Sequence, residues 1–145
     1  GDGPLFNKFN QEIIKNNLHH INLLGRVDQY EVLNLMKKAR LLIFPSLWYE
    51  GFPMTVIEAY ACGLPVIASN LGSMQEIIDD QITGLLFEPG KSKALKETVL
   101  SIWDQEKRIQ FLGENARKVF KEEYNPNKKL ESLLTIYQQA IDEKH

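Results

Sequence analysis

Two glutamates with seven residues between them stand in the segment Glu50-Gly51-Phe52-Pro53-Met54-Thr55-Val56-Ile57-Glu58. A carboxylate accepts hydrogen bonds from paired hydroxyl groups, so one acid is suited to a sugar and the other to a ribose. Pro53 favours a helix start, because the first helical position does not need its amide hydrogen. A helix start offers unpaired amides and a partial positive charge, which suit a diphosphate between the two acids.

Short apolar runs that alternate with amphipathic helices must position these acids. The runs predict four strands, at Ile21 to Gly25, Arg40 to Pro45, Pro65 to Ser69 and Gly84 to Phe87. Strands that are apolar on both faces and separated by helices predict an α/β fold, with a Rossmann-like parallel sheet and helices on both faces. Ligands bind such sheets beyond the carboxyl ends of the strands. The loops from Ser46 to Phe52 and at Gly25-Arg26-Val27 are therefore expected on one rim.

Apolar residues at helical spacing predict the helices. These are Leu5 to Asn17, a helix capped by Asp28 and Glu31, Pro53 to Cys62 with an end at Gly63, Ser73 to Asp79, and a helical carboxyl terminus after Lys91. We expect Ser73 and Glu76 to form a capping box. On the last helix we expect an apolar stripe to dock on the helices that cover the sheet; it consists of Leu130, Leu133, Leu134 and Tyr137.

The size and composition of the chain bound its function. Its 145 residues, 43% of them hydrophobic, predict one domain over 1–145. A net charge of -2 argues against a nucleic-acid partner. One cysteine, Cys62, and the lack of a signal peptide or of an apolar run that could cross a membrane favour a cytoplasmic protein. The histidines show no metal-ligand pattern, so no metal or other cofactor is expected.

The central segment resembles the donor-domain signature of glycosyltransferase family 4, a family of retaining enzymes with two facing Rossmann-like domains, the GT-B fold. The residues that carry the resemblance are Phe44-Pro45-Ser46, Glu50-Gly51-Phe52, Glu58-Ala59 and Gly63-Leu64-Pro65-Val66-Ile67-Ala68-Ser69. Three flanking segments are also similar to parts of that domain, in the right order; they are Gly1-Asp2-Gly3-Pro4, Leu24-Gly25-Arg26-Val27 and Gly84-Leu85-Leu86-Phe87.

The resemblance implies a donor site for a nucleoside-diphosphate sugar, without a metal. Glu50 would contact the transferred sugar and support the reacting centre, and Glu58 would bind the ribose hydroxyls. The segment Phe52 to Thr55 would face the diphosphate and the sugar, with Gly51 allowing close approach. Val27 would face the nucleobase, and Gly3 would lie in the glycine-rich turn. Many members have glycine at the position of Pro53, so here the amide contacts are expected from Met54 and Thr55.

Parts of the family pattern do not occur in this chain. The basic pair that precedes the glycine-rich turn and the amino-terminal acceptor domain are both absent from the sequence. We therefore expect a fragment that binds donor weakly and transfers nothing by itself. The full enzyme is expected to build a polysaccharide or glycolipid in the cytoplasm, with peripheral attachment to the inner membrane left open.

Several alternatives stay open at this stage. Arg26 either neutralises the diphosphate or lies on the surface, and Trp48 and Tyr49 either form a stacking platform or anchor the loop by packing. A non-catalytic nucleotide-binding or regulatory module would have the same fold. A dinucleotide-dependent oxidoreductase is disfavoured, because Phe6 stands where the third glycine of its fingerprint belongs.

Overall fold

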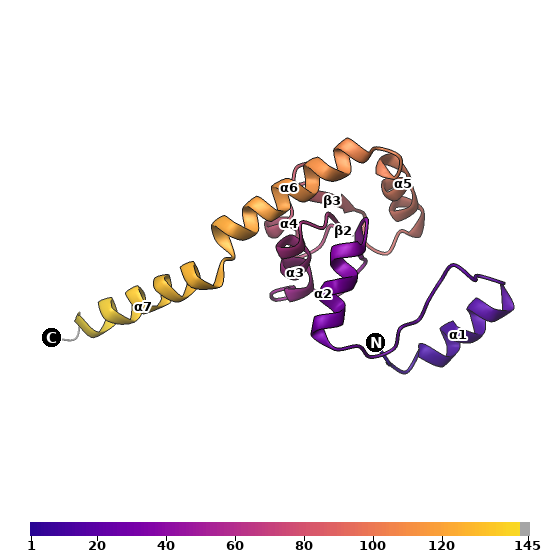
Figure 1. Ribbon diagram of the computed structural model, residues 1–145, viewed down its shortest axis with the longest axis horizontal. Helices are drawn as coiled ribbons and strands as arrows, with labels where there is room; N and C mark the ends of the chain where they lie inside the picture. Colours follow the sequence, from indigo (N-terminus) through magenta and orange to yellow (C-terminus); the bar gives the residue numbers. More distant parts are fainter. Residues whose placement is uncertain (143–145) are drawn as a thin grey trace. The chain divides into compact units, whose positions relative to one another are not determined.

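The computed structural model describes residues 1–142, except for the side chains of 126–129, 131–132, 140 and 142 (Figure 1). The chain divides into two compact units, Gly1–Leu35 and the part from Met36 onward, and each is described by itself. Within the described residues no helix is long and apolar enough to cross a membrane.

The first unit contains α1 (Phe6–Lys15) and most of α2 (Gln29–Lys38). The Asp28 Oδ1 atom accepts a hydrogen bond from the Glu31 amide at 2.9 Å, which confirms the predicted cap of α2. The predicted strand from Ile21 to Gly25 is wrong, because this segment is in neither a helix nor a strand. Apolar character alone does not make a strand: among the described residues no strand forms a ladder with this segment, and Leu24 is exposed.

The second unit is built on a parallel sheet of β1 (Leu42–Phe44), β2 (Val66–Ser69) and β3 (Gly84–Phe87), in the order β1-β2-β3. The other three predicted strands are thereby confirmed. β2 is buried along its whole length, as expected for a central strand that is covered on both faces. Residues Phe44, Ala68 and Leu86 lie side by side in the register, so the three strands end at one edge of the sheet.

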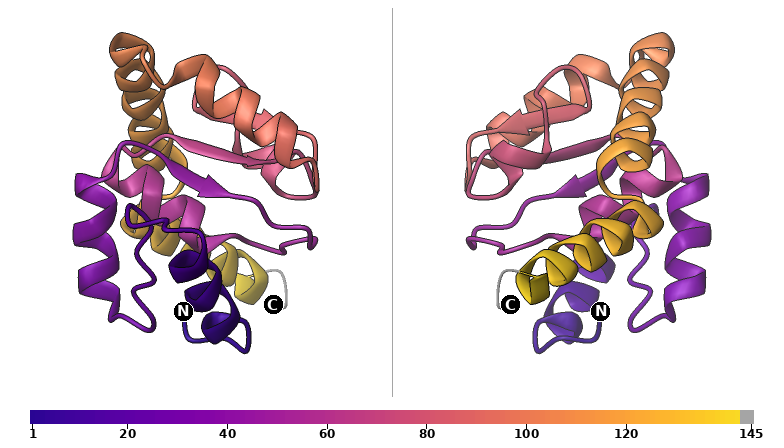
Figure 2. Two further views of the ribbon diagram at one scale, coloured as in Figure 1. Left: turned by 90° about the vertical axis from the view of Figure 1, so that its right-hand side faces the viewer. Right: turned by 90° about the vertical axis from the view of Figure 1, so that its left-hand side faces the viewer.

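Helices cover both faces of this sheet, as the sequence predicts. Figure 2 shows α5 (Ser92–Ile102) on one side of the strands and α3 (Met54–Cys62) on the other. On the α5 side, side chains from β2, β3, α5 and α6 (Glu106–Glu123) form one buried cluster of Ile67, Leu85, Phe87, Ile102, Ile109 and Leu112. Burying each of these side chains contributes roughly 1.5–3 kcal/mol, which makes the sheet a rigid support for its loops.

The end of α3 packs closely on α6. Gly63 ends α3 in the left-handed conformation, with φ 68°, as the sequence predicts. A Cβ atom added to Gly113 of α6 would overlap the Gly63 carbonyl oxygen and lie 3.4 Å from Pro65 Cδ. Glycine at position 113 therefore allows the α6 backbone to lie against the turn that leaves α3.

Tyr60 fastens α3 to the segment that leads into β3. Its side chain is fully buried, and its hydroxyl lies 2.8 Å from Thr83 Oγ1, which accepts a second hydrogen bond from the Asp79 amide. Burial raises the pKa of Tyr60 to about 12, although the hydrogen bond with Thr83 works in the opposite direction. This network stabilises α3 on the side opposite to α5.

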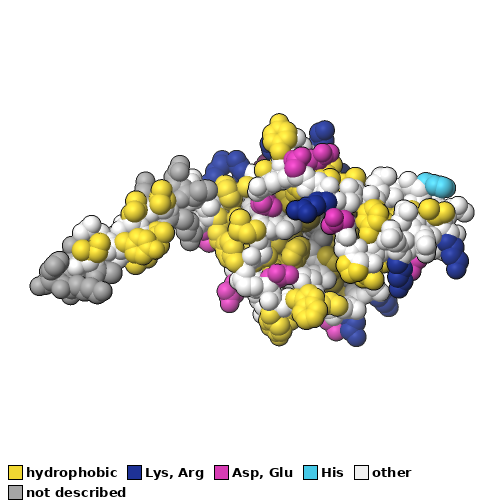
Figure 3. Space-filling model, turned by 90° about the horizontal axis from the view of Figure 1, so that it is seen from below, with side chains coloured by type: hydrophobic (Ala, Val, Ile, Leu, Met, Phe, Trp, Pro, Cys, Tyr) yellow, Lys and Arg dark blue, Asp and Glu magenta, His cyan; other side chains and the backbone are white. Residues whose placement is uncertain are grey.

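The last helix, α7 (Pro126–Asp142), corrects one prediction. The stripe of Leu130, Leu133, Leu134 and Tyr137 does not dock on the rest of the domain, because each of these side chains is between 44% and 58% exposed. Hydrophobic side chains are visible along this helix in Figure 3. The spacing correctly predicts an apolar helix face, but it does not say what covers that face.

Candidate functional site

The candidate site lies where β1 and β2 end. β1 and β2 are parallel neighbours, so the loop 45–53 after β1 and the turn 70–73 after β2 leave the same edge of the sheet. Two contacts join these segments. The Ser73 hydroxyl donates to the Glu50 carbonyl oxygen at 2.7 Å, and a Cβ atom added to Gly72 would lie only 3.0 Å from Tyr49 Cδ1.

The Glu50 side chain is half-buried at this edge. Its Oε1 atom accepts a hydrogen bond from the Ser46 hydroxyl at 2.9 Å, and the Ser46 oxygen accepts one from the Trp48 amide at 3.3 Å. Glu50 is thus fixed by one hydrogen bond from Ser46 of its own loop and one from Ser73 of the neighbouring turn. No described residue hydrogen-bonds the Oε2 atom, so this oxygen can accept a bond from a ligand.

The start of α3 follows directly after Glu50. Pro53 has φ -81° and ψ 85°, and the Met54 amide donates to the Phe52 carbonyl at 3.0 Å, so 52–54 form an inverse γ-turn. The Met54 amide is therefore engaged by the protein itself. The Thr55 amide has no hydrogen bond among the described residues and remains a donor at the positive end of the helix dipole.

Glu58 lies one turn further along α3. It follows Met54 by four positions, so the two side chains lie on the same face of the helix. Met54 is exposed and Glu58 half-buried, whereas Ile57 and Ala59 beside it are buried in the core. Glu58 is therefore on the accessible face of α3, and this face begins at the helix start that follows Glu50.

The aromatic residues of the loop differ in their surroundings. Trp48 is 80% exposed, so it is not the packing anchor that was one of its two predicted roles. The Phe52 ring lies 6.0 Å, centre to centre, from the ring of Tyr124, the residue that ends α6. Phe52 is thereby held in a tilted aromatic pair while half of its surface stays exposed.

The remaining predicted site residues belong to the first unit. Gly3 and Arg26 are exposed and Val27 is half-buried. The structure therefore brings together the predicted residues from Glu50 to Glu58, all within the second unit. It shows Gly3, Arg26 and Val27 only in their own unit.

Ser73 is a site residue that the sequence analysis missed. The predicted capping box with Glu76 is wrong, since Ser73 has helical φ -61° and ψ -15° and its side chain makes no cap bond to α4 (Met74–Ile77). A capping residue needs extended backbone angles, which this turn does not provide. Its position in the sequence indicates a place near the site, because Ser73 follows a strand whose carboxyl end lies on the ligand rim.

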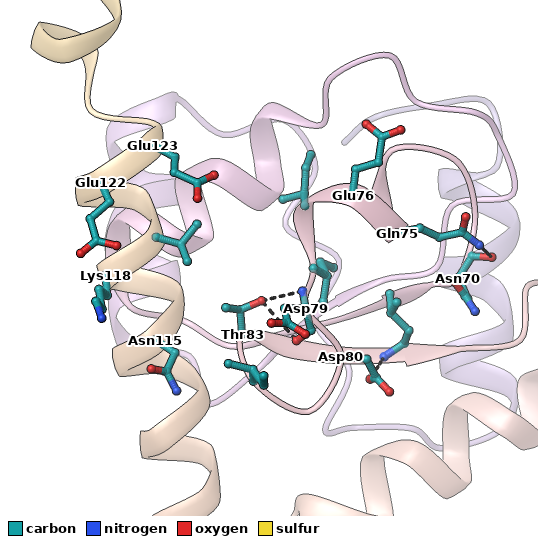
Figure 4. A pocket seen from close by; sticks show the side chains of 15 residues that line it. Asn70, Gln75, Glu76, Asp79, Asp80, Thr83, Asn115, Lys118, Glu122 and Glu123 are labelled. Carbon is teal, nitrogen blue, oxygen red and sulfur yellow. Dashed lines mark hydrogen bonds between the residues drawn. The ribbon is translucent and has the colours of Figure 1, made fainter.

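A cavity of about 760 Å³ lies elsewhere, between α4, the segment that leads into β3, and α6 (Figure 4). None of the predicted site residues lines it. Its charged side chains are one lysine and five acids, namely Lys118, Glu76, Asp79, Asp80, Glu122 and Glu123. This excess of negative charge makes the cavity unsuited to a diphosphate.

A parallel sheet with helices on both faces is the architecture of a Rossmann-like domain, and its structural neighbours are GT-B glycosyltransferases. The family described as glycosyl transferases group 1 matches residues 1–119, and the chain belongs to this family. An uncharacterised glycosyltransferase of Methanocaldococcus jannaschii is 38% identical over 142 residues, which cover 98% of this chain and 40% of that protein.

Solved structures agree on the fold. A sucrose-phosphate synthase from Thermosynechococcus elongatus has a TM-score of 0.87 and 27% identity, over 98% of this chain and 37% of that one. The Anabaena protein HepE, solved in complex with UDP and glucose, has a TM-score of 0.76 and 23% identity, over 94% of this chain and 35% of that one. The chain thus spans about two fifths of the length of the proteins that it matches.

Proposed function

We propose that this chain is the donor-binding domain of a retaining glycosyltransferase of family 4, which transfers a sugar from a nucleoside-diphosphate sugar. The observation that carries the proposal is the Glu50 carboxylate, which Ser46 holds just before a helix start with an unpaired Thr55 amide. The UDP and glucose in the complex of HepE, a protein of the same fold, support a donor of this class.

The sugar, the diphosphate and the ribose of the donor each have a counterpart in this arrangement. The free oxygen of Glu50 accepts a hydrogen bond from a sugar hydroxyl, and the Thr55 amide donates to the diphosphate. Glu58 accepts hydrogen bonds from the ribose hydroxyls. Gly51 is exposed, and a Cβ atom at this position would meet nothing within 4 Å, so the loop leaves room for the ligand. Because the Met54 amide is engaged in the γ-turn, Thr55 supplies the amide contact that was expected from both.

The same groups favour cleavage of the donor. As the bond between the anomeric carbon and the diphosphate oxygen breaks, the sugar gains positive charge and the leaving group gains negative charge. The Glu50 carboxylate stabilises the first charge, and the start of α3 stabilises the second. Both groups are fixed before the reaction, so they do not have to reorganise during it.

The parts of the proposal outside α3 concern the first unit and the rest of the enzyme. The roles of Val27 at the nucleobase and of Gly3 and Arg26 at the diphosphate stay predictions from the family resemblance. A second domain binds the acceptor, and the complete enzyme acts in polysaccharide or glycolipid synthesis in the cytoplasm. The chain by itself binds the donor weakly and does not transfer the sugar. No metal takes part in this proposal, because the start of α3 supplies positive charge for the leaving diphosphate.

Replacement of Glu58 by glutamine tests the nucleotide part of the proposal. Loss of a charge-assisted hydrogen bond is expected to weaken nucleoside-diphosphate binding by about 10-fold or more. The complete protein is titrated by calorimetry with UDP, GDP and ADP, and the best ligand is then compared with its 2′-deoxy form. The wild-type protein should prefer the ribose form, and the Glu58→Gln variant should lose most of this preference.

Glu97 provides the matched control, because it is an exposed glutamate on α5 that forms an ion pair with Lys93 at 3.8 Å. The Glu97→Gln variant should bind like the wild-type protein. Failure of all three nucleoside diphosphates to bind at millimolar concentration would favour a structural module. Tight nucleotide binding without cleavage of any donor sugar would favour the regulatory alternative.

A further inference from the structure

Glu50 is held at two separate points by serine hydroxyls. Ser46, in the loop that follows β1, donates to the carboxylate Oε1 atom at 2.9 Å. Ser73, in the turn after β2, donates to the Glu50 backbone carbonyl at 2.7 Å. Both contacts are partly buried, so water competes with them less than it would at an exposed loop. One serine therefore fixes the side chain and the other fixes the backbone that carries it.

The direction of the Ser46 hydroxyl follows from its second contact. The Trp48 amide donates to the Ser46 oxygen at 3.3 Å, which uses a lone pair of that oxygen. The hydroxyl hydrogen is then available for the carboxylate, which at neutral pH can only accept. Since Ser46 occupies Oε1, the other oxygen of Glu50 is left to the ligand, at a position set by the loop.

Ser73 connects the turn after β2 to this loop by a hydrogen bond. The preceding residue, Gly72, has φ 57° and lies against Tyr49, so the turn after β2 and the loop after β1 pack directly on each other. A glycine tolerates this left-handed conformation and the close approach of the tyrosine ring. The Ser73 hydroxyl adds a directional bond to this contact, and the bond ends on Glu50 itself.

We propose that Ser46 and Ser73 are positioning residues that aim the free carboxylate oxygen of Glu50 at the transferred sugar. This inference rests on the proposed function, because it takes Glu50 as the group that faces the sugar. Neither serine touches the donor in this arrangement. Loss of either hydroxyl is expected to weaken binding of the sugar and to lower turnover. If the serines had a merely structural role, nucleotide binding would fall as much as turnover.

The test compares Ser46→Ala and Ser73→Ala with the wild-type complete protein. A panel of UDP-glucose, UDP-galactose, UDP-N-acetylglucosamine, GDP-mannose and ADP-glucose first selects the donor that binds best. Calorimetry then gives the Kd of that donor and of its nucleoside diphosphate. Release of the nucleoside diphosphate, with water as the acceptor of the sugar, gives the turnover. We expect each variant to reduce turnover by about 10-fold, with the nucleoside-diphosphate Kd unchanged within about 2-fold.

Four further variants make this result specific. Ser46→Thr and Ser73→Thr keep the hydroxyl and should recover most of the turnover. Ser101→Ala is the matched control, because Ser101 also donates to a backbone carbonyl at 2.7 Å, that of Thr98, but on α5. In a Glu50→Gln background, Ser46→Ala should cause little further loss, since both changes act through the same carboxylate.

The outcomes separate this inference from the function on which it rests. If Glu50→Gln abolishes turnover but the serine variants are fully active, the positioning role is wrong and the proposed function stands. If nucleotide affinity falls as much as turnover in the serine variants, their role is structural and the inference is also wrong. If no donor of the panel binds, or if Glu50→Gln is fully active, the proposed function itself fails.

Discussion

The Glu50→Gln variant is expected to cleave the donor about 10²–10³-fold more slowly than the wild-type protein. Glutamine has nearly the same size, so the hydrogen bond from Ser46 and the path of the loop are preserved. What the variant loses is the negative charge beside the sugar, which matters most when the sugar becomes positively charged in the transition state. The loss should therefore appear in kcat more than in KM.

The measurement is the rate of nucleoside-diphosphate release from the best donor with water as acceptor. Calorimetry gives the Kd of the nucleoside diphosphate alone. The nucleotide affinity of Glu50→Gln should stay within about 2-fold of the wild-type value, because the nucleotide does not contact this acid in our proposal. Glu97→Gln serves again as the control for loss of a negative charge. Wild-type turnover in Glu50→Gln would show that this carboxylate does not support the reacting centre.

The Gly113→Ala variant is expected to lose about 3 kcal/mol of stability, although alanine normally stabilises a helix by about 1 kcal/mol relative to glycine. The added methyl group meets the Gly63 carbonyl oxygen and Pro65, which belong to the turn between α3 and β2. Backbone cannot yield as a flexible side chain does, so α6 must move away from α3. Equilibrium unfolding in urea, followed by circular dichroism, measures the change in the free energy of unfolding.

Glu114 gives the control for this variant, because it is the next residue of α6 and is exposed. The Glu114→Ala substitution adds no atoms and should change stability by no more than about 0.5 kcal/mol. A Gly113→Ala variant that is as stable as the wild-type protein would show that α3 and α6 do not need this close approach. Retained donor binding at low temperature would separate the loss of stability from a loss of the site.

The sheet and the Glu50 segment are predictable from the sequence because their signals are local. β2 is an apolar run between Pro65 and a polar turn, and buried parallel strands need no more than this. The end of α3 at Gly63 follows from the left-handed conformation that glycine adopts readily. The order of strands and helices then places Glu50 on the ligand rim.

The errors concern features that depend on partners distant in the sequence. The segment from Ile21 to Gly25 has the composition of a strand, but no described strand pairs with it. Ser73 has the spacing of a capping residue, yet its hydroxyl bonds Glu50, which lies 23 residues away. The stripe on α7 has the spacing of a packed helix face but is exposed. Local pattern specifies the element, whereas its partner is set by tertiary structure.

A crystal structure of the complete protein with its best nucleotide-sugar donor tests the central claim most directly. We predict a sugar hydroxyl within about 3.2 Å of the Glu50 Oε2 atom, the diphosphate at the Thr55 amide, and the ribose hydroxyls at Glu58. A nucleotide bound away from the start of α3, or carboxylates of Glu50 and Glu58 that both point away from it, would contradict the account.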